Sequence, residues 1–213
     1  VAVTRVAHAQ VAHRERAAPQ RAGGQVGKAQ VGAGVAAVEA LRFSIEDNTL
    51  GIMRVKDTPS DAGKARVAVT LPSLEKVTLA GSGTIEGPSL SGKAEVTIAG
   101  SGTARTASVD ASAVEVTIAG TGTYAAGGRA NSLDLTIAGS GQADMAGLRV
   151  DTAEVTIAGS GSATFASDGT VDATVMGSGE VTVSGSARCT IKSMGSGKLN
   201  CQSGTTTGTL PRT

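Results

Sequence analysis

A short pattern of apolar and polar positions recurs along most of the chain. A Gly-Ser/Thr-Gly motif occurs seven times, and the intervals between successive motifs are 19, 20, 19, 20, 18 and 18 residues. The first glycines of the motifs are Gly81, Gly100, Gly120, Gly139, Gly159, Gly177 and Gly195. Self-similarity at a fixed period of this size is the mark of a solenoid. Positions below are counted from the first glycine of each motif.

Apolar and polar residues alternate on both sides of each motif. Positions −4 and −2 are apolar in almost every repeat, and position −3 is threonine in six of seven, as in Val96, Thr97 and Ile98. After the motif the alternation resumes, with position +4 apolar and position +5 mostly polar. A period of two is typical of a strand with one buried face. Each repeat therefore predicts a strand, a sharp glycine corner and a second strand.

This pattern predicts an all-β fold, a right-handed single-stranded β-helix (β-solenoid) with about seven coils of 18–20 residues. Two glycines per repeat permit positive φ and close stacking of one coil on the next. Successive coils are expected to stack at roughly 4.8 Å. A sandwich of hairpins is the alternative, but its turns would rarely keep such a constant register.

The repeats also divide the chain into segments. We expect a poorly ordered or atypical N-terminal segment at 1–40, a β-hairpin or cap region at 41–71, the β-helix repeats at 72–202 and a flexible tail at 203–213. The hairpin is predicted to turn at Asp47 and Asn48, with a further strand at 65–71. A cap would cover the terminal coil, whose edge is otherwise open to other chains.

Composition fits this fold and excludes several classes of function. The chain has 30 Gly, 2 Phe, 1 Tyr and no Trp, so the core must consist of small and β-branched residues. The net charge of +1 gives no global field for nucleic acid. No apolar run is long enough for a transmembrane helix. A signal peptide is not visible after Val1, so it was either removed or lies before the given start.

The two cysteines occupy inward columns of the last repeat. Cys189 lies at position −6 and Cys201 at position +6, where other repeats carry apolar residues. The pair is thus expected to face across the core of the final coil, either as a disulfide or as two buried thiols. A disulfide would contribute roughly 3 kcal/mol by restricting the unfolded chain, and it would imply an oxidising compartment.

A column of carboxylates is the best candidate for a surface site. Position −5 is acidic in five successive repeats: Glu95, Glu115, Asp134, Glu154 and Asp172. Because stacked like charges repel, the column must face water or bind cations. A calcium stripe is one interpretation, but the repeat lacks the aspartate of calcium-binding glycine repeats. We favour a solvated face that discourages sideways strand pairing, and predict no metal and no cofactor.

Catalysis finds little support in the repeats. They contain no histidine, since His8 and His13 both precede them, and no coil gathers a catalytic cluster. We therefore predict that the protein is not an enzyme. A polysaccharide-active enzyme is the minor alternative, and its groove would be lined by residues from neighbouring coils: Arg105, Arg129, Asp110 and Asp144. Stacked Thr and Ser hydroxyls would serve either as a sugar-binding array or as ordinary β-surface.

The segments TLPSLEKVTLAGSG, EVTIAGSG and ATVMGSG, with the repeat length and the terminal cysteine pair, resemble the head GIN domain family, a bacterial domain of unknown function described as a putative autotransporter adhesin. The resemblance covers about residues 41–201, whereas residues 1–40 depart from it. It implies an extracytoplasmic β-helix in the periplasm or at the cell surface, and it supplies no established site residues.

These observations lead to one functional prediction. We expect a non-enzymatic, extracytoplasmic structural or adhesion-type protein that presents its Thr/Ser and carboxylate surface to an envelope component or polysaccharide. A self-assembling rod that stacks end to end is the second hypothesis. Nucleic acid is not expected as a partner.

Overall fold

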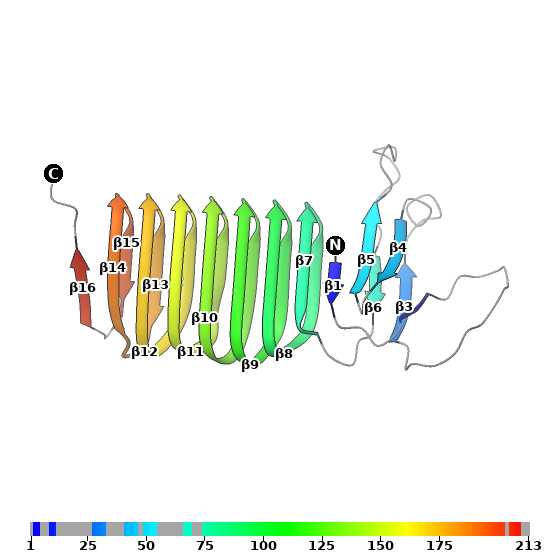
Figure 1. The fold of residues 1–213 in the computed structure, drawn as a ribbon, viewed down its shortest axis with the longest axis horizontal. Coiled ribbons are helices and arrows are strands. Elements are labelled where there is room, and N and C mark those ends of the chain that lie inside the picture. Colours follow the sequence, from blue (N-terminus) through cyan, green and yellow to red (C-terminus); the bar gives the residue numbers. More distant parts are fainter. Residues whose placement is uncertain are drawn as a thin grey trace. The chain divides into compact units, whose positions relative to one another are not determined.

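The computed structural model describes residues 2–4, 9–11, 27–32, 41–46, 49–54, 66–69, 74–202 and 205–209. The chain divides into two compact units, Val1–Leu74 and Glu75–Thr213. Every regular element in the described residues is a β-strand, and the second unit is a stack of parallel coils. The predicted all-β solenoid is confirmed (Figure 1).

The first unit contains two small groups of paired strands. Its strands are β1 (Ala2–Thr4), β2 (Ala9–Val11), β3 (Gly27–Gly32), β4 (Leu41–Glu46), β5 (Thr49–Arg54) and β6 (Arg66–Val69). Strands β4 and β5 form an antiparallel hairpin, and β1 pairs with β5. Strand β3 pairs with β2 and with β6. The predicted hairpin is therefore present, although its turn residues Asp47 and Asn48 lie outside the described residues.

The N-terminal segment contains short strands. Residues 1–40 show no strand pattern in sequence, yet β1, β2 and β3 all lie within them. These strands are short, and each is defined by its backbone pairing with another strand. The remaining boundaries, including the cap role of 41–71 and the flexible tail, stay predictions.

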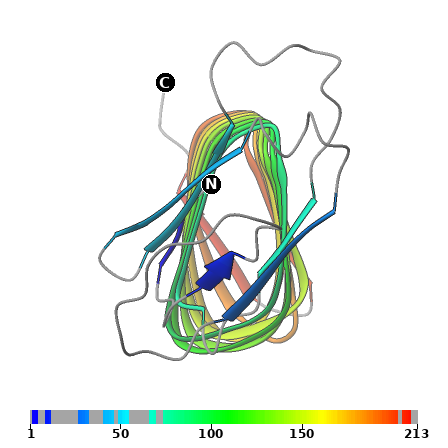
Figure 2. The same ribbon diagram turned by 90° about the vertical axis from the view of Figure 1, so that its right-hand side faces the viewer.

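In the described residues of the second unit there are ten strands. They are β7 (Lys76–Gly81), β8 (Thr84–Gly100), β9 (Thr103–Gly120), β10 (Thr123–Gly139), β11 (Gln142–Gly159), β12 (Ser162–Gly177), β13 (Glu180–Ser184), β14 (Arg188–Gly195), β15 (Lys198–Cys201) and β16 (Thr205–Thr209). Consecutive coils pair in parallel, so equal positions of each repeat stack on one another. Viewed along the stack, the coils superimpose as an elongated ring (Figure 2).

The strands of the middle coils are longer than the sequence pattern predicts. Strand β9, for example, runs without interruption from one glycine motif to the next over 18 residues. The second bend of the coil is made inside the strand by register shifts, such as those between Ala126 and Gly128 and between Gly92 and Lys93. A β-bulge bends a strand while pairing resumes on both sides, so no separate corner is needed.

The glycine motif forms the sharp corner that the repeat predicts. Gly139 has a φ of +120°, and a Cβ built on it would lie 2.5 Å from the carbonyl oxygen of Gly120 in the preceding coil. The backbone ladder nevertheless continues through the corner, because the N–H of Ser140 donates to that same oxygen at 2.9 Å. Only glycine satisfies both the positive φ and the close approach of the backbones.

The core contains the residues that the alternation placed inside. The inward columns at positions −4 and −2 are buried from β7 to β12. The largest buried side chains are Tyr124 and Phe165. The Tyr124 hydroxyl donates a 3.2 Å hydrogen bond to Oγ1 of Thr106 in the preceding coil. Burial raises the pKa of Tyr124, and this hydrogen bond offsets part of that effect.

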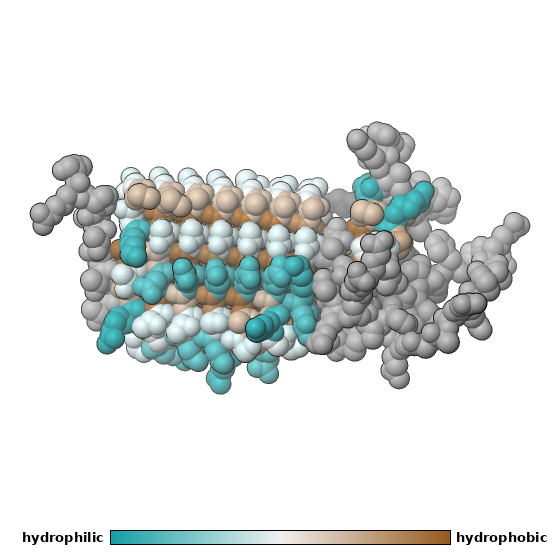
Figure 3. Space-filling model, viewed as in Figure 1, coloured by the Kyte–Doolittle hydropathy of each residue, from teal (hydrophilic) through white to brown (hydrophobic). Residues whose placement is uncertain are grey.

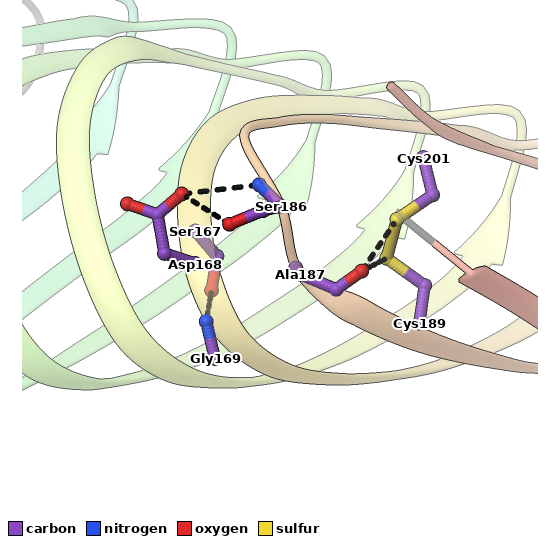
Figure 4. Close-up of a disulfide and its surroundings, with 7 residues drawn as sticks. All are labelled: Ser167, Asp168, Gly169, Ser186, Ala187, Cys189 and Cys201. Carbon is purple, nitrogen blue, oxygen red and sulfur yellow. Dashed lines mark hydrogen bonds between the residues drawn. A yellow bond between two sulfur atoms is a disulfide. The ribbon is translucent and has the colours of Figure 1, made fainter. Parts of the chain in front are cut away.

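The C-terminal end of the solenoid is closed by the predicted disulfide. Cys189 of β14 and Cys201 of β15 are bonded, with their Cα atoms 6.4 Å apart. The carbonyl oxygen of Ala187 faces both sulfur atoms (Figure 4). The bond therefore joins the two strands of the last coil across the core, and the alternative of two free thiols is wrong.

A polar cluster at the bend before β14 links neighbouring coils where the repeat shortens to 18 residues. Oδ1 of Asp168 accepts hydrogen bonds from the backbone N–H and the hydroxyl of Ser186, at 3.0 and 3.1 Å (Figure 4). Nη1 of Arg149 donates to its other oxygen at 2.7 Å. The hydrogen bonds from Ser186, followed by the charge of Arg149, hold the pKa of Asp168 below its usual value.

Candidate functional site: a carboxylate groove along the solenoid

The predicted carboxylate column is present as a continuous row along one face. Backbone pairing places each of its members directly beside the next: Glu95 with Glu115, Glu115 with Asp134, Asp134 with Glu154, and Glu154 with Asp172. Their strands direct the side chains outward because the neighbouring −6 and −4 positions point into the core. The row lies along the solenoid axis and crosses five coils.

A shallow groove of about 630 Å³ follows this row. One wall consists of the five carboxylates. The other wall is position −7, which contributes Lys93, Ala113, Ser132, Thr152 and Thr170, and the position −6 residues between the walls form the floor. Small side chains at −7 leave room beside the longer carboxylates, so the surface is concave there. The groove is long, narrow and open to solvent.

The groove is strongly acidic, with limited compensation. Nζ of Lys76 lies 2.5 Å from Oε1 of Glu95, so the row is neutralised at its N-terminal end. At the other end, Asp172 is followed by Thr190 instead of a sixth carboxylate. Among the described residues, no three acidic, histidine or cysteine side chains are close enough to hold a metal ion.

The hydroxyl array lies on the same strands as the carboxylates. The threonines of position −3 stack in register and are half-buried, from Thr78 in β7 to Thr174 in β12. Exposed alanines of position −1 form the next column towards the glycine corner. Figure 3 shows these columns as parallel bands, hydrophilic, neutral and apolar, along the solenoid. A ligand lying in the groove would have a flat row of hydroxyls beside it.

The residues suggested for an enzymatic groove do not gather in this one. Arg105 and Asp144 share a column but are separated by Ala125, and Arg129 pairs in register with Asp110 in a different column. None of these four side chains lines the groove. Tyr124 is fully buried and offers no ring to a ligand. The structure thus brings Arg129 beside Asp110 but does not gather the four residues at one place.

The concavity itself was not predicted from the sequence. The carboxylate column is visible as a repeat, but a groove requires a small partner column and a local change of backbone direction. The run of Ala113, Ser132, Thr152 and Thr170 at position −7 is the signal that could have indicated it. That signal acquires meaning only once the bend that precedes this column is known.

The fold and this surface define a non-globular β-solenoid with a repetitive polar face. The chain belongs to the family described as "putative auto-transporter adhesin, head GIN domain", whose model matches residues 21–187. This confirms the resemblance seen in the sequence. No protein with a curated description matches the chain.

Two solved structures share the fold at low sequence identity. A putative adhesin from Bacteroides fragilis NCTC 9343 is 22% identical, with a TM-score of 0.73 and 81% of each chain covered. A putative lipid binding protein from Parabacteroides distasonis ATCC 8503 is 18% identical, with a TM-score of 0.61 over 93% of this chain and 90% of that one. Identity at this level establishes the likeness of fold alone.

The extent of the family match corrects the expected boundaries of the resemblance. The match begins at residue 21, so half of the segment that was expected to depart from the family falls within it. It ends at residue 187, before Cys189, and the cysteine pair is therefore not part of the matched region. In the described part of the chain, no helix is long and apolar enough to cross a membrane.

Proposed function

We propose that this protein is a non-enzymatic, extracytoplasmic adhesion-type solenoid whose acidic groove binds an envelope polysaccharide. The observation that carries the proposal is the groove itself, which runs along the axis across five coils and is lined by carboxylates and hydroxyls. A linear polymer fits such a site because it can repeat its contacts from coil to coil. Carboxylate oxygens are strong acceptors for sugar hydroxyls.

The negative charge of the groove limits which sugars can bind there. Five carboxylates in a row disfavour uronic acids and phosphorylated sugars, because like charges repel at close range. Neutral sugars and sugars with free amino groups are the ligands that this surface favours. The family description and the disulfide both support a location outside the cytoplasm.

A glycan array probed with the full chain tests this proposal. We expect retention of neutral or amino-sugar polymers and little retention of acidic ones. The double variant Glu115→Gln/Asp134→Asn should weaken binding roughly tenfold or more, since hydrogen bonds to charged groups contribute about 1.5–3 kcal/mol each. Asp110→Asn serves as the matched control, because Asp110 is exposed but lies outside the groove.

The same experiment separates the competing interpretations. Binding that requires added calcium would point to a cation bridging the carboxylates. Cleavage of a bound glycan that is lost in Glu115→Ala or Asp134→Ala would show that the protein is an enzyme. Equal binding by the groove variant and the wild type would contradict the proposal.

A further inference from the structure

The last coil departs from the repeat in a consistent direction. Position −1 is alanine in the first five repeats, but it is Met176 and then Met194 in the last two. Position −3 is threonine in six repeats, but it is Lys192 in the last. Position −7 becomes Arg188 and position −5 loses its carboxylate to Thr190. These changes give the last coils outward side chains that are larger, more apolar and more basic than those of the other coils.

These replacements lie on one outward face. In β14 the inward Cys189 and Ser193 are buried, so Arg188, Lys192 and Met194 project together from the opposite side. Met194 stacks on Met176 of β12, and the two side chains are 60% and 39% exposed. Two large exposed apolar side chains beside cationic ones form an amphipathic surface, which we call the C-terminal patch: Met176, Arg188, Lys192 and Met194.

The charge of the solenoid is divided between its body and this end. Residues 75–180 contain twelve acidic and five basic side chains, whereas residues 181–202 contain three basic ones and no acidic one. Lys192 stacks between Thr174 and Thr209, away from any carboxylate in the pairing register. Lys198 lies beside Glu180, which offsets part of its charge. The modest net charge of the whole chain conceals this polarity.

We propose that the C-terminal patch docks on an anionic lipid surface. Methionine side chains enter the interface between headgroups and acyl chains, while lysine and arginine remain at the level of the phosphates. Lysine carries a compact charge on a flexible side chain, so it can interact with mobile lipid headgroups without a fixed bidentate geometry. None of the patch residues lines the groove, and this inference does not depend on the proposed function.

Vesicle flotation with the full chain tests the proposal. The probes are vesicles of phosphatidylcholine alone and of phosphatidylcholine mixed with phosphatidylglycerol. We expect the wild type to float with the mixed vesicles only, and the bound fraction to fall as salt is raised, because surface charges are screened.

The repeat supplies substitutions that other coils already carry at the same positions. Arg188→Thr/Lys192→Thr and Met176→Ala/Met194→Ala should each weaken partitioning on the order of tenfold, given about 1 kcal/mol per lysine or arginine near an anionic surface and about 0.8 kcal/mol per buried methylene. Lys93→Thr and Met53→Ala are matched controls, because both residues are exposed but belong to other surfaces. Thermal melts without vesicles check that every variant is folded.

The outcomes of the flotation experiment either support or overturn the proposal. Loss of flotation in both patch variants and in neither control supports the proposal. Absence of wild-type flotation, or equal flotation with neutral vesicles, overturns it. Sedimentation without lipid adds a further arm: if the wild type self-associates and the patch variants do not, the patch is an interface between copies and not a membrane surface.

Discussion

At the scale of single residues, the glycine corner limits the fold most strictly. The first glycine of the motif combines a positive φ with a backbone approach that excludes a side chain, as described for Gly139. We predict that Gly139→Ala destabilises the protein by about 2–4 kcal/mol, combining strain at positive φ with a clash against a rigid carbonyl. Thermal or urea unfolding measures the effect.

A second glycine provides the control for this prediction. At Gly147 the nearest atom to a built Cβ is 3.5 Å away, and its φ is not in the left-handed region. Gly147→Ala should therefore change stability by less than about 1 kcal/mol, in either direction. If both substitutions cost the same, the corner geometry is not what restricts Gly139.

The sequence predicted the direction of most side chains but not every polar contact. Alternation around the motif placed Val96, Ile98 and their equivalents inside, because a strand directs successive side chains to opposite faces. It did not predict the hydrogen bond between Tyr124 and Thr106, since that contact depends on which residues of neighbouring coils lie in register. The Arg149–Asp168–Ser186 cluster was missed for the same reason.

At the scale of elements, the disulfide replaces contacts that the last coil lacks. Strand β15 pairs with β13 on one side, and no partner for its other edge is present among the described residues. Inward position −2 is Ser193 in this coil, where earlier coils have leucine, isoleucine or valine. The covalent link between β14 and β15 thus compensates for a smaller core and an open edge.

We predict that Cys189→Val/Cys201→Val lowers the free energy of unfolding by about 2–4 kcal/mol, because the unfolded chain loses its cross-link. Valine is the residue that the preceding coil carries at both positions, Val171 and Val183, so the core keeps its apolar character. Unfolding in the presence and absence of a reductant provides the check. The reductant should destabilise the wild type to the level of the variant and leave the variant unchanged.

The elements themselves were predicted unevenly. Strands before the motifs were clear in sequence because Val, Thr and Ile alternate there without interruption. The second bend was not located, because a bulge needs one extra residue on one strand and has no fixed composition. Insertions of one residue between coils, visible as intervals of 18 to 20, were its only trace.

At the scale of the whole molecule, each coil of the solenoid contacts mainly its two neighbours. Stability in such a stack is close to a sum of coil and interface contributions, and the ends open first. We predict that amide hydrogen exchange is slowest in β9–β11 and fastest in β15 and β16. Exchange at a single rate through all coils would instead show that the solenoid unfolds as one cooperative unit.

The polarity of the solenoid is also a property of this scale. An acidic groove in the body and a basic, methionine-bearing patch at one end are separated by the stacking direction. If both proposals hold, one molecule would present its groove to a polysaccharide while its end contacts lipid. The glycan and vesicle experiments test these surfaces independently, since their substitutions do not overlap.

The sequence by itself determined the coil length, the glycine corners, the inward and outward columns, the carboxylate row and the cysteine pair. It could do so because a repeat of constant register fixes neighbours through backbone pairing alone. Tertiary structure decided the rest: that the carboxylate row is one wall of a groove, and that substitutions scattered over Met176 to Met194 gather on one outward face at the end of the stack. Those features depend on where the backbone bends and on which coil is last, and neither is encoded in a local period.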